Sequence, residues 1–66
     1  MAIVKVIEIH SEGNSIEAAA ESALSEAAKT VKEIRNIYIQ DLQAIVENEK
    51  ITKYRINAKI SFVIKN

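Results

Sequence analysis

"ITKYRINAKISFVI", residues 51–64, alternates apolar and polar side chains along nearly its whole length. This period of two is typical of a β-strand with one buried face. The even positions carry Tyr54, Ile56, Ala58, Ile60, Phe62 and Ile64, and the odd positions carry Lys53, Arg55, Asn57, Lys59 and Ser61. We expect the even positions to face a core and the odd positions to form the outer face of a sheet.

A second strand is predicted just before this one, from about Ile34 to Val46, and it includes the stretch "EIRNIYIQD". Its apolar residues first occupy odd positions and then even ones, whereas its early polar residues are Asn36, Tyr38 and Gln40. A phase change of one residue indicates a β-bulge or strong twist near Gln40 to Leu42. "ENEK", residues 47–50, is the predicted turn that joins the two strands into a hairpin.

The first strand is predicted over "AIVKVIEIH", Ala2 to His10, because β-branched residues dominate a short run. Apolar side chains lie on both of its faces, with Ile7 and Ile9 on one face and Val4 and Val6 on the other. One helix can cover only one face of such a strand. The second face therefore predicts contact with other subunits.

A helix is predicted after "SEGN", where Gly13 is expected to take a positive φ and Asn14 with Glu17 has the spacing of a capping box. The apolar residues that follow have the spacing of one helical face over about five turns. They are Ile16, Ala19, Ala20, Ala23, Leu24, Ala27, Val31 and Ile34. The alanines predict that the helix lies close against a concave sheet.

These elements predict one α+β domain over residues 1–66, in the order β-α-β-β. The helix returns the chain so that the second strand runs parallel to the first, and the hairpin makes the third strand antiparallel to both. An all-antiparallel three-stranded sheet then requires the strand order 2-3-1. The hairpin is longer than the helix, so the sheet is expected to curl around the helix.

The size and composition of the chain predict that it assembles with copies of itself. A chain of 66 residues buries only about 60% of the surface that it exposes when unfolded. It has no cysteine and one histidine, which excludes disulfides and any zinc site built from cysteine or several histidines of one chain. Because 48% of the residues are hydrophobic, oligomerisation is the expected means of stabilisation.

Charge and motifs exclude several classes of function. Nine basic residues balance nine acidic ones, so nucleic acid is not an expected partner. No apolar run reaches the length of a membrane span, and no cleavage pattern follows the N-terminus, so we expect a soluble cytoplasmic protein without a membrane partner. The residues offer no catalytic pair or triad, and an enzyme is not expected. His10 is expected to be a surface or interface residue beside a turn.

The outer face of the hairpin is the candidate binding surface. It gathers hydrogen-bonding, cationic and aromatic groups that suit an anionic or planar ligand. The candidate residues are Asn36, Tyr38, Gln40, Arg55 and Asn57. A solvated sheet face or a polar subunit interface would also explain this pattern. Glu47 and Glu49 at the hairpin tip are candidate calcium ligands, and a solvated turn is the alternative reading.

The segments "KVIEI", "SIEAAAESALSEAAKTV", "IRNIYIQD" and "TKYRINAKISFVI" together resemble the dodecins, a family of very small flavin-binding proteins. The resemblance covers nearly the whole chain. It implies a hollow homododecamer that binds or stores a flavin, FMN or riboflavin, between subunits.

The ungapped match to flavin-binding dodecins puts Asn36 at the position of their stacking tryptophan and Arg55 at the position of a glutamine that contacts the flavin ring. The chain is in this respect similar to a tryptophan-less branch of dodecin-like proteins. This similarity implies an alternative, a flavin-free shell with a structural or calcium-binding role.

Overall fold

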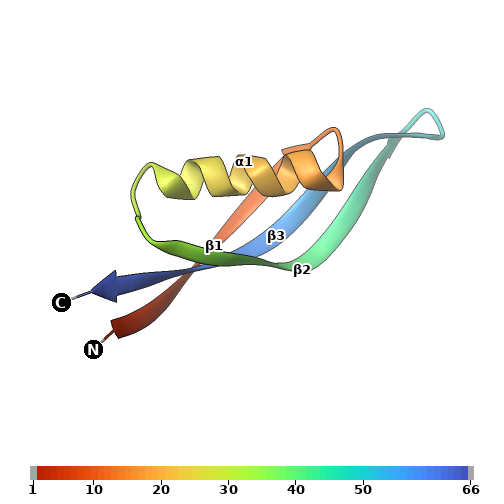
Figure 1. The fold of residues 1–66 in the computed structure, drawn as a ribbon. Helices are drawn as coiled ribbons and strands as arrows, with labels where there is room; N and C mark the ends of the chain where they lie inside the picture. Colours follow the sequence, from red (N-terminus) through yellow and green to blue (C-terminus); the bar gives the residue numbers. More distant parts are fainter. Residues whose placement is uncertain (1, 66) are drawn as a thin grey trace.

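A computed structural model describes residues 2–65 and has the predicted β-α-β-β order (Figure 1). The elements are β1 (Ala2–Gly13), α1 (Ile16–Ala28), β2 (Ile34–Glu47) and β3 (Lys50–Lys65). β3 lies between β1 and β2 and is antiparallel to both, so the predicted strand order and the central third strand are confirmed. The helix covers one face of the sheet, which leaves an opposite, outer face (Figure 1).

The core lies where α1 packs against the middle of β3. On the helix, Ala19, Ala23 and Ala27 are at most 1% exposed, and their spacing of four residues places them in one stripe. On the sheet they meet the even positions of β3, where Ile56, Ala58 and Ile60 are equally buried. The expected core face of the third strand is therefore confirmed. Short alanine side chains allow the helix backbone to lie close to the sheet.

The helix begins one residue later than the predicted capping box. Ser15 is the N-cap, and its hydroxyl oxygen accepts a hydrogen bond from the backbone N–H of Ala18 at 3.0 Å. The prediction of Asn14 as the cap was therefore wrong. Both residue types suit this position, and the helix uses the second of them.

The helix also ends earlier than predicted, after 13 residues, or about three and a half turns. Thr30 and Val31 donate backbone hydrogen bonds to the Ala27 carbonyl, and β-branched residues do not favour continuing the helix. Val31 and Ile34 still pack against the core, from the connection and from the start of β2. Their helical spacing therefore reflects a shared core face and not a longer helix.

Two residues of the predicted helical face are not buried in the chain. Ile16 is 41% exposed and Leu24 is 40% exposed. Ile16 is the first residue of α1, one turn before the buried alanines, and Leu24 lies beside the alanine stripe. The predicted close packing of the alanines is confirmed, whereas these two larger residues of the same helical pattern stay partly open to solvent.

Gly13 differs from its predicted role. It does not take a positive φ, and β1 continues to this residue instead of ending at His10. A Cβ atom here would lie 2.5 Å from the backbone nitrogen of Ala19. Beside it, the Ser11 hydroxyl donates a 2.6 Å hydrogen bond to the Ala19 carbonyl. Glycine is therefore needed for close packing of strand against helix and not for a turn.

The predicted bulge in the second strand is confirmed. The register of β2 against β3 shifts between Ile39 and Asp41, so Gln40 is the extra residue. Ile39 pairs with Ala58 before the shift, and Leu42 pairs with Ile56 after it, so both parts of the strand direct apolar residues to the same side. The bulge therefore allows both parts of β2 to face the same core, although their alternation differs by one residue.

The hairpin turn is formed by Asn48 and Glu49, with φ values of 52° and 62°. Glu47 pairs with Lys50 directly across it, so this is a two-residue turn with the positive φ angles of type I′. The hairpin extends well past the helix, as expected from its length, and contributes to a longest dimension of 52 Å (Figure 1).

We expect Glu49→Gly to raise the free energy of unfolding by about 1 kcal/mol, because a side chain in the left-handed region costs roughly 1–2 kcal/mol and glycine loses part of that gain through its freer unfolded chain. Urea unfolding at one fixed protein concentration measures the change. Glu47→Gly, in the adjoining extended strand, is the control and should destabilise. A Glu49→Gly protein that is less stable than wild type would contradict this account of the turn.

Many large apolar side chains of the described chain remain open to solvent. They are Ile3, Val4, Val6, Ile16, Leu24, Tyr38, Ile39, Leu42, Val46 and Ile51. They lie on β1, on the flank of α1 and along the projecting hairpin. Val4 and Val6, at 63% and 57% exposed, lie on the outer face of the sheet, where α1 does not reach. This distribution matches a chain that packs against further subunits.

Candidate ligand site on the outer face of the sheet

The outer face changes from apolar to polar along the strands. The antiparallel pairing sets its residues in rows that cross all three strands. From the end nearest the chain termini the rows are Val6–Ser61–Asn36, Glu8–Lys59–Tyr38, His10–Asn57–Asp41 and Glu12–Arg55–Gln43. The polar rows bring the candidate residues onto one surface.

The candidate residues form two groups on this surface. Arg55 and Asn57 line a shallow pocket of about 240 Å³, together with Asp41, Leu42 and Gln43. Asn36 pairs with Ser61, six residues along β3 from Arg55, which corresponds to about 20 Å. Within one chain, Asn36 and Arg55 therefore do not share a pocket. Gln40, exposed in the bulge, lies between the two groups.

The first group, Asn36 and Tyr38, contains an amide and an aromatic ring. The Asn36 amide oxygen accepts a hydrogen bond from the Ser61 hydroxyl of β3. Tyr38 lies one row further along, opposite Lys59, and is 62% exposed. An exposed ring on a polar sheet face offers a flat apolar surface to a planar partner.

The second group, Arg55 and Asn57, is held in place by polar contacts between strands. The side-chain amide of Asn57 donates a 3.1 Å hydrogen bond to the carboxylate of Asp41. This contact orients the Asn57 amide beside the pocket. It also gives the Asp41 carboxylate a partner in an exposed position.

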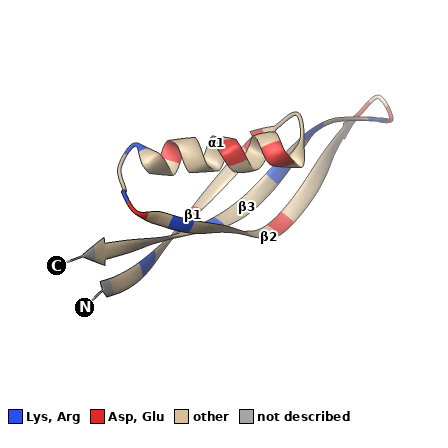
Figure 2. Cartoon of the chain, viewed as in Figure 1, with Lys and Arg blue, Asp and Glu red and all other residues tan. Residues whose placement is uncertain are grey.

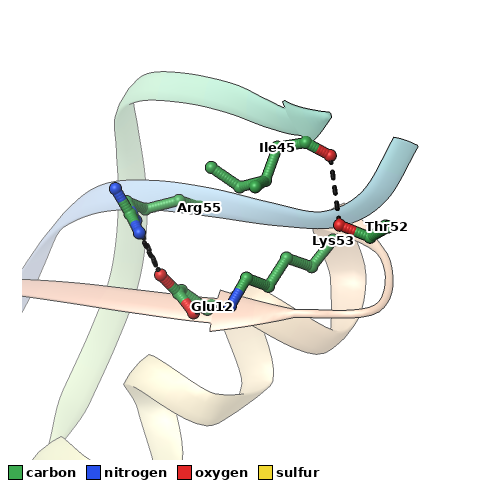
Figure 3. A network of polar contacts seen from close by, with 5 residues as sticks. All are labelled: Glu12, Ile45, Thr52, Lys53 and Arg55. Atoms are coloured by element: carbon green, nitrogen blue, oxygen red, sulfur yellow. Dashed lines mark hydrogen bonds and ion pairs between the residues drawn. The ribbon is translucent and has the colours of Figure 1, made fainter. Parts of the chain in front are cut away.

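Glu12 of β1 links the two cations near the pocket (Figure 3). Its Oε2 accepts a hydrogen bond from Arg55 Nε at 2.7 Å, and its Oε1 lies 3.1 Å from Lys53 Nζ. Sequence reasoning missed Glu12 because the first strand was predicted to end at His10. The alternation of Val4, Val6, Glu8 and His10 continues to residue 12 and could have placed it on the outer face.

Asp41 and Gln43 were missed for a related reason. The predicted bulge moves the apolar residues of β2 from odd to even positions, and it must move the polar face in the opposite sense. Beyond Gln40, the outer face is therefore carried by Asp41 and Gln43. The same phase change, which correctly placed the core residues of β2, could have identified these two residues.

Two carboxylates on the outer face have lowered pKa values. Hydrogen bonds from Arg55 and then Lys53 lower the pKa of Glu12, because they stabilise the charged form. A hydrogen bond with His10, whose Nε2 lies 3.0 Å from Glu8 Oε2, lowers the pKa of Glu8. His10 lies within β1 on an exposed face, not beside a turn as predicted.

The lowered pKa of Glu12 predicts a pH dependence of stability. A carboxylate whose pKa is lowered in the folded state stabilises the fold at any pH above its ordinary, unfolded-state pKa. That contribution is lost as the pH falls through the pKa of the folded state. We expect the thermal midpoint of the wild type to fall between about pH 5 and pH 3 more steeply than that of Glu12→Gln. Parallel pH profiles for the two proteins would show that this ion pair does not contribute.

The hairpin tip holds the two candidate calcium ligands, Glu47 and Glu49, both exposed. Within residues 2–65, no three His, Asp or Glu side chains lie close enough together to hold a metal ion.

Acidic and basic residues are interspersed along the ribbon (Figure 2). No helix in the described part of the chain is both long and apolar enough to cross a bilayer.

One helix against a three-stranded antiparallel sheet, with a polar pocket on an otherwise partly apolar outer face, defines a very small binding protein. The sequence profile of the dodecin family matches residues 3–65. The chain belongs to the dodecin family.

Solved structures agree with this assignment. A protein from Thermus thermophilus has a TM-score of 0.90 at 18% identity, over 100% of this chain and 98% of that chain. A substitution variant of the T. thermophilus dodecin has a TM-score of 0.89 at 18% identity, over 100% of both chains. The dodecin from Streptomyces coelicolor has a TM-score of 0.87 at 14% identity, over 98% and 94%. A comparison with curated proteins finds no match.

Membership of the family has three consequences. Dodecins are non-enzymatic binding proteins, in agreement with the expectation that the chain is not an enzyme. They are homo-oligomers, which agrees with the exposed apolar residues of this chain. They commonly bind flavins.

Proposed function

We propose that this dodecin is a homododecameric shell that binds or stores a small planar ligand, a flavin such as FMN or riboflavin, between the outer faces of neighbouring copies. The observation that carries the proposal is the polar pocket beside Arg55 and Asn57, on a surface whose other end is apolar and exposed. The apolar end suits contact between copies. The polar end suits a ligand held between them.

The side chains at this surface fit the parts of a flavin. A flavin ring has a polar edge with both donors and acceptors, and the pocket offers the guanidinium of Arg55 with the amides of Gln43 and Asn57. When bound, the flavin would supply its own redox chemistry, and the chain would supply binding and orientation. In this proposal Arg55 recognises the ring edge, Asn36 forms a hydrogen-bonding wall and Tyr38 is a stacking ring.

The distance between the two groups supports a site made by two copies. Asn36 and Arg55 lie about 20 Å apart along one sheet, which is too far for one ring system to contact both. In the proposed assembly two outer faces meet in opposite directions, which would bring the first group of one copy near the second group of another. Gln40 in the bulge lies between the groups and is part of the proposed lining.

Native mass spectrometry of protein purified without added cofactor, followed by a denaturing run and an absorbance scan, tests this proposal. We expect a dodecameric mass and a flavin-sized ligand, or binding of added riboflavin with quenching of its fluorescence. A colourless, empty dodecamer that binds neither riboflavin nor FMN would overturn the flavin proposal and retain the shell.

A second candidate function is a flavin-free shell with a structural or calcium-binding role. The hydrogen bond between Asn36 and Ser61 favours it, since this amide already has a partner within the chain. Glu47 and Glu49 could bind calcium if symmetry gathers several hairpin tips, because calcium takes six to eight oxygen ligands. Metal analysis of the purified assembly tests this role. Metal-free protein with unchanged stability in chelator would exclude the calcium form.

A further inference from the structure

The charges around the pocket balance one another within a few residues. Two cations, Arg55 and Lys53, share one carboxylate, because each oxygen of Glu12 faces one of them (Figure 3). The second carboxylate, Asp41, lines the pocket and accepts from Asn57. The four charged groups therefore sum to zero, although the pocket contains an arginine.

This charge balance determines how favourably the pocket binds a negatively charged group. A phosphate that approaches Arg55 also approaches the Glu12 carboxylate, which is 2.7 Å from the Arg55 Nε atom. It also meets the Asp41 carboxylate, which lines the same pocket. Like charges at such distances repel, and this repulsion offsets the attraction of the guanidinium.

An uncharged polar ligand does not meet this repulsion. A guanidinium carries five N–H donors, so Arg55 keeps donors for a ligand while it contacts Glu12 through its Nε and Nη2 atoms. The amides of Gln43 and Asn57 add donors and acceptors without charge. Glu12 also limits the movement of Arg55, which lowers the cost of ordering a long side chain on binding.

From these contacts we infer that Glu12 makes the site selective for an uncharged planar ligand with a polar edge, and against the phosphorylated form of the same ligand. Glu12 acts as a positioning residue for Arg55 and as the group that neutralises it. The inference rests on the proposed function, because it concerns the ligand class of that same site.

Riboflavin and FMN are a suitable pair of probes, because they differ by one phosphate group. Their dissociation constants are measured by fluorescence titration of the intact assembly for wild type, Glu12→Gln, Lys53→Gln and the control Glu17→Gln. Glu17 lies on α1, on the other side of the sheet, so the control removes the same charge at a distance. Native mass spectrometry confirms that each variant is assembled.

We expect wild type to bind riboflavin more tightly than FMN. Glu12→Gln should reduce this preference about two- to fourfold, the effect of one charge about 5–10 Å from another in an exposed site, because the FMN phosphate is on the ribityl chain and not on the ring edge that Arg55 contacts. Lys53→Gln should increase the preference, and Glu17→Gln should leave it unchanged. The opposite directions of the first two variants separate a charge effect from a loss of structure, which would weaken both ligands alike.

Three results would overturn the inference while the proposed function survives. They are equal or tighter binding of FMN by wild type, an unchanged preference in Glu12→Gln, and shifts of the same sign in Glu12→Gln and Lys53→Gln. If neither flavin binds, the flavin proposal fails, and calorimetric titration with inorganic phosphate tests the charge balance separately. Phosphate binding by Glu12→Gln but not by wild type would support it. The same response in both proteins would overturn it.

Discussion

Val6→Glu is expected to break the assembly into smaller species and to lower its thermal stability. Val6 is 57% exposed in the single chain, next to the equally open Val4, on the face that α1 does not cover. If a neighbouring copy covers this face, a carboxylate placed there is buried without a partner, at a cost of several kcal/mol per subunit. The same substitution also adds charge beside Glu8 of the next outer-face row.

The loss of assembly should also destabilise the chain itself. The buried apolar residues among residues 2–65 are few, and three of them are alanines of α1. A domain of this size is marginal on its own, so the separated subunit should unfold at a lower temperature. Light scattering after size-exclusion chromatography measures the assembly, and calorimetry measures the thermal midpoint.

Ser22→Glu is the matched control for this prediction. It adds the same charge at an exposed position of α1, one turn before Ser25 and Glu26, which are also exposed. We expect this variant to keep the size of the wild-type assembly. A Val6→Glu protein that is as large and as stable as wild type would show that copies do not pack against this part of the outer face.

Gly13→Ala is expected to destabilise the fold by about 3 kcal/mol, at the upper end of the usual cost of overpacking. The added Cβ would lie 2.5 Å from the backbone nitrogen of Ala19 and 2.8 Å from the carbonyl carbon of Ala18. Backbone atoms in the first turn of a helix cannot rotate away as a side-chain terminus can. Relief would require β1 to separate from α1, which would loosen the packing of Ala19 against the sheet.

Urea unfolding at a fixed protein concentration tests this prediction. Asn14→Ala, at the next and exposed position, is the control and should have only a small effect. Equal midpoints for Gly13→Ala and wild type would show that strand and helix separate at little cost. A change in the slope of the transition would instead indicate loss of two-state behaviour.

The local pattern of side chains determined most of the fold of this chain. The strict alternation of β3 was sufficient to identify its core face, since a strand directs successive residues to opposite sides. The phase change in β2 identified the bulge at Gln40, because both parts of that strand must direct apolar residues to one core. The turn at residues 47–50 and the central place of β3 follow from the same pattern.

The limits of the helix and the role of Gly13 depended on contacts between elements. Val31 and Ile34 have helical spacing, yet they reach the core from outside the helix. Ser15, and not Asn14, became the cap, although both residue types can fill that position. Glycine is required at residue 13 because Ala18 and Ala19 lie close to it. The sequence of the "SEGN" segment alone does not indicate this contact.

For the candidate site, the sequence by itself determined which residues share the outer face, because alternation assigns faces without reference to the rest of the chain. Only the tertiary structure decided which of those residues are neighbours. It separated Asn36 from Arg55 by six positions of β3, and it placed Glu12 of β1 between Arg55 and Lys53. The physical reason is that the register between strands depends on the packing of the whole sheet against α1, whereas the face of each residue depends on its own strand.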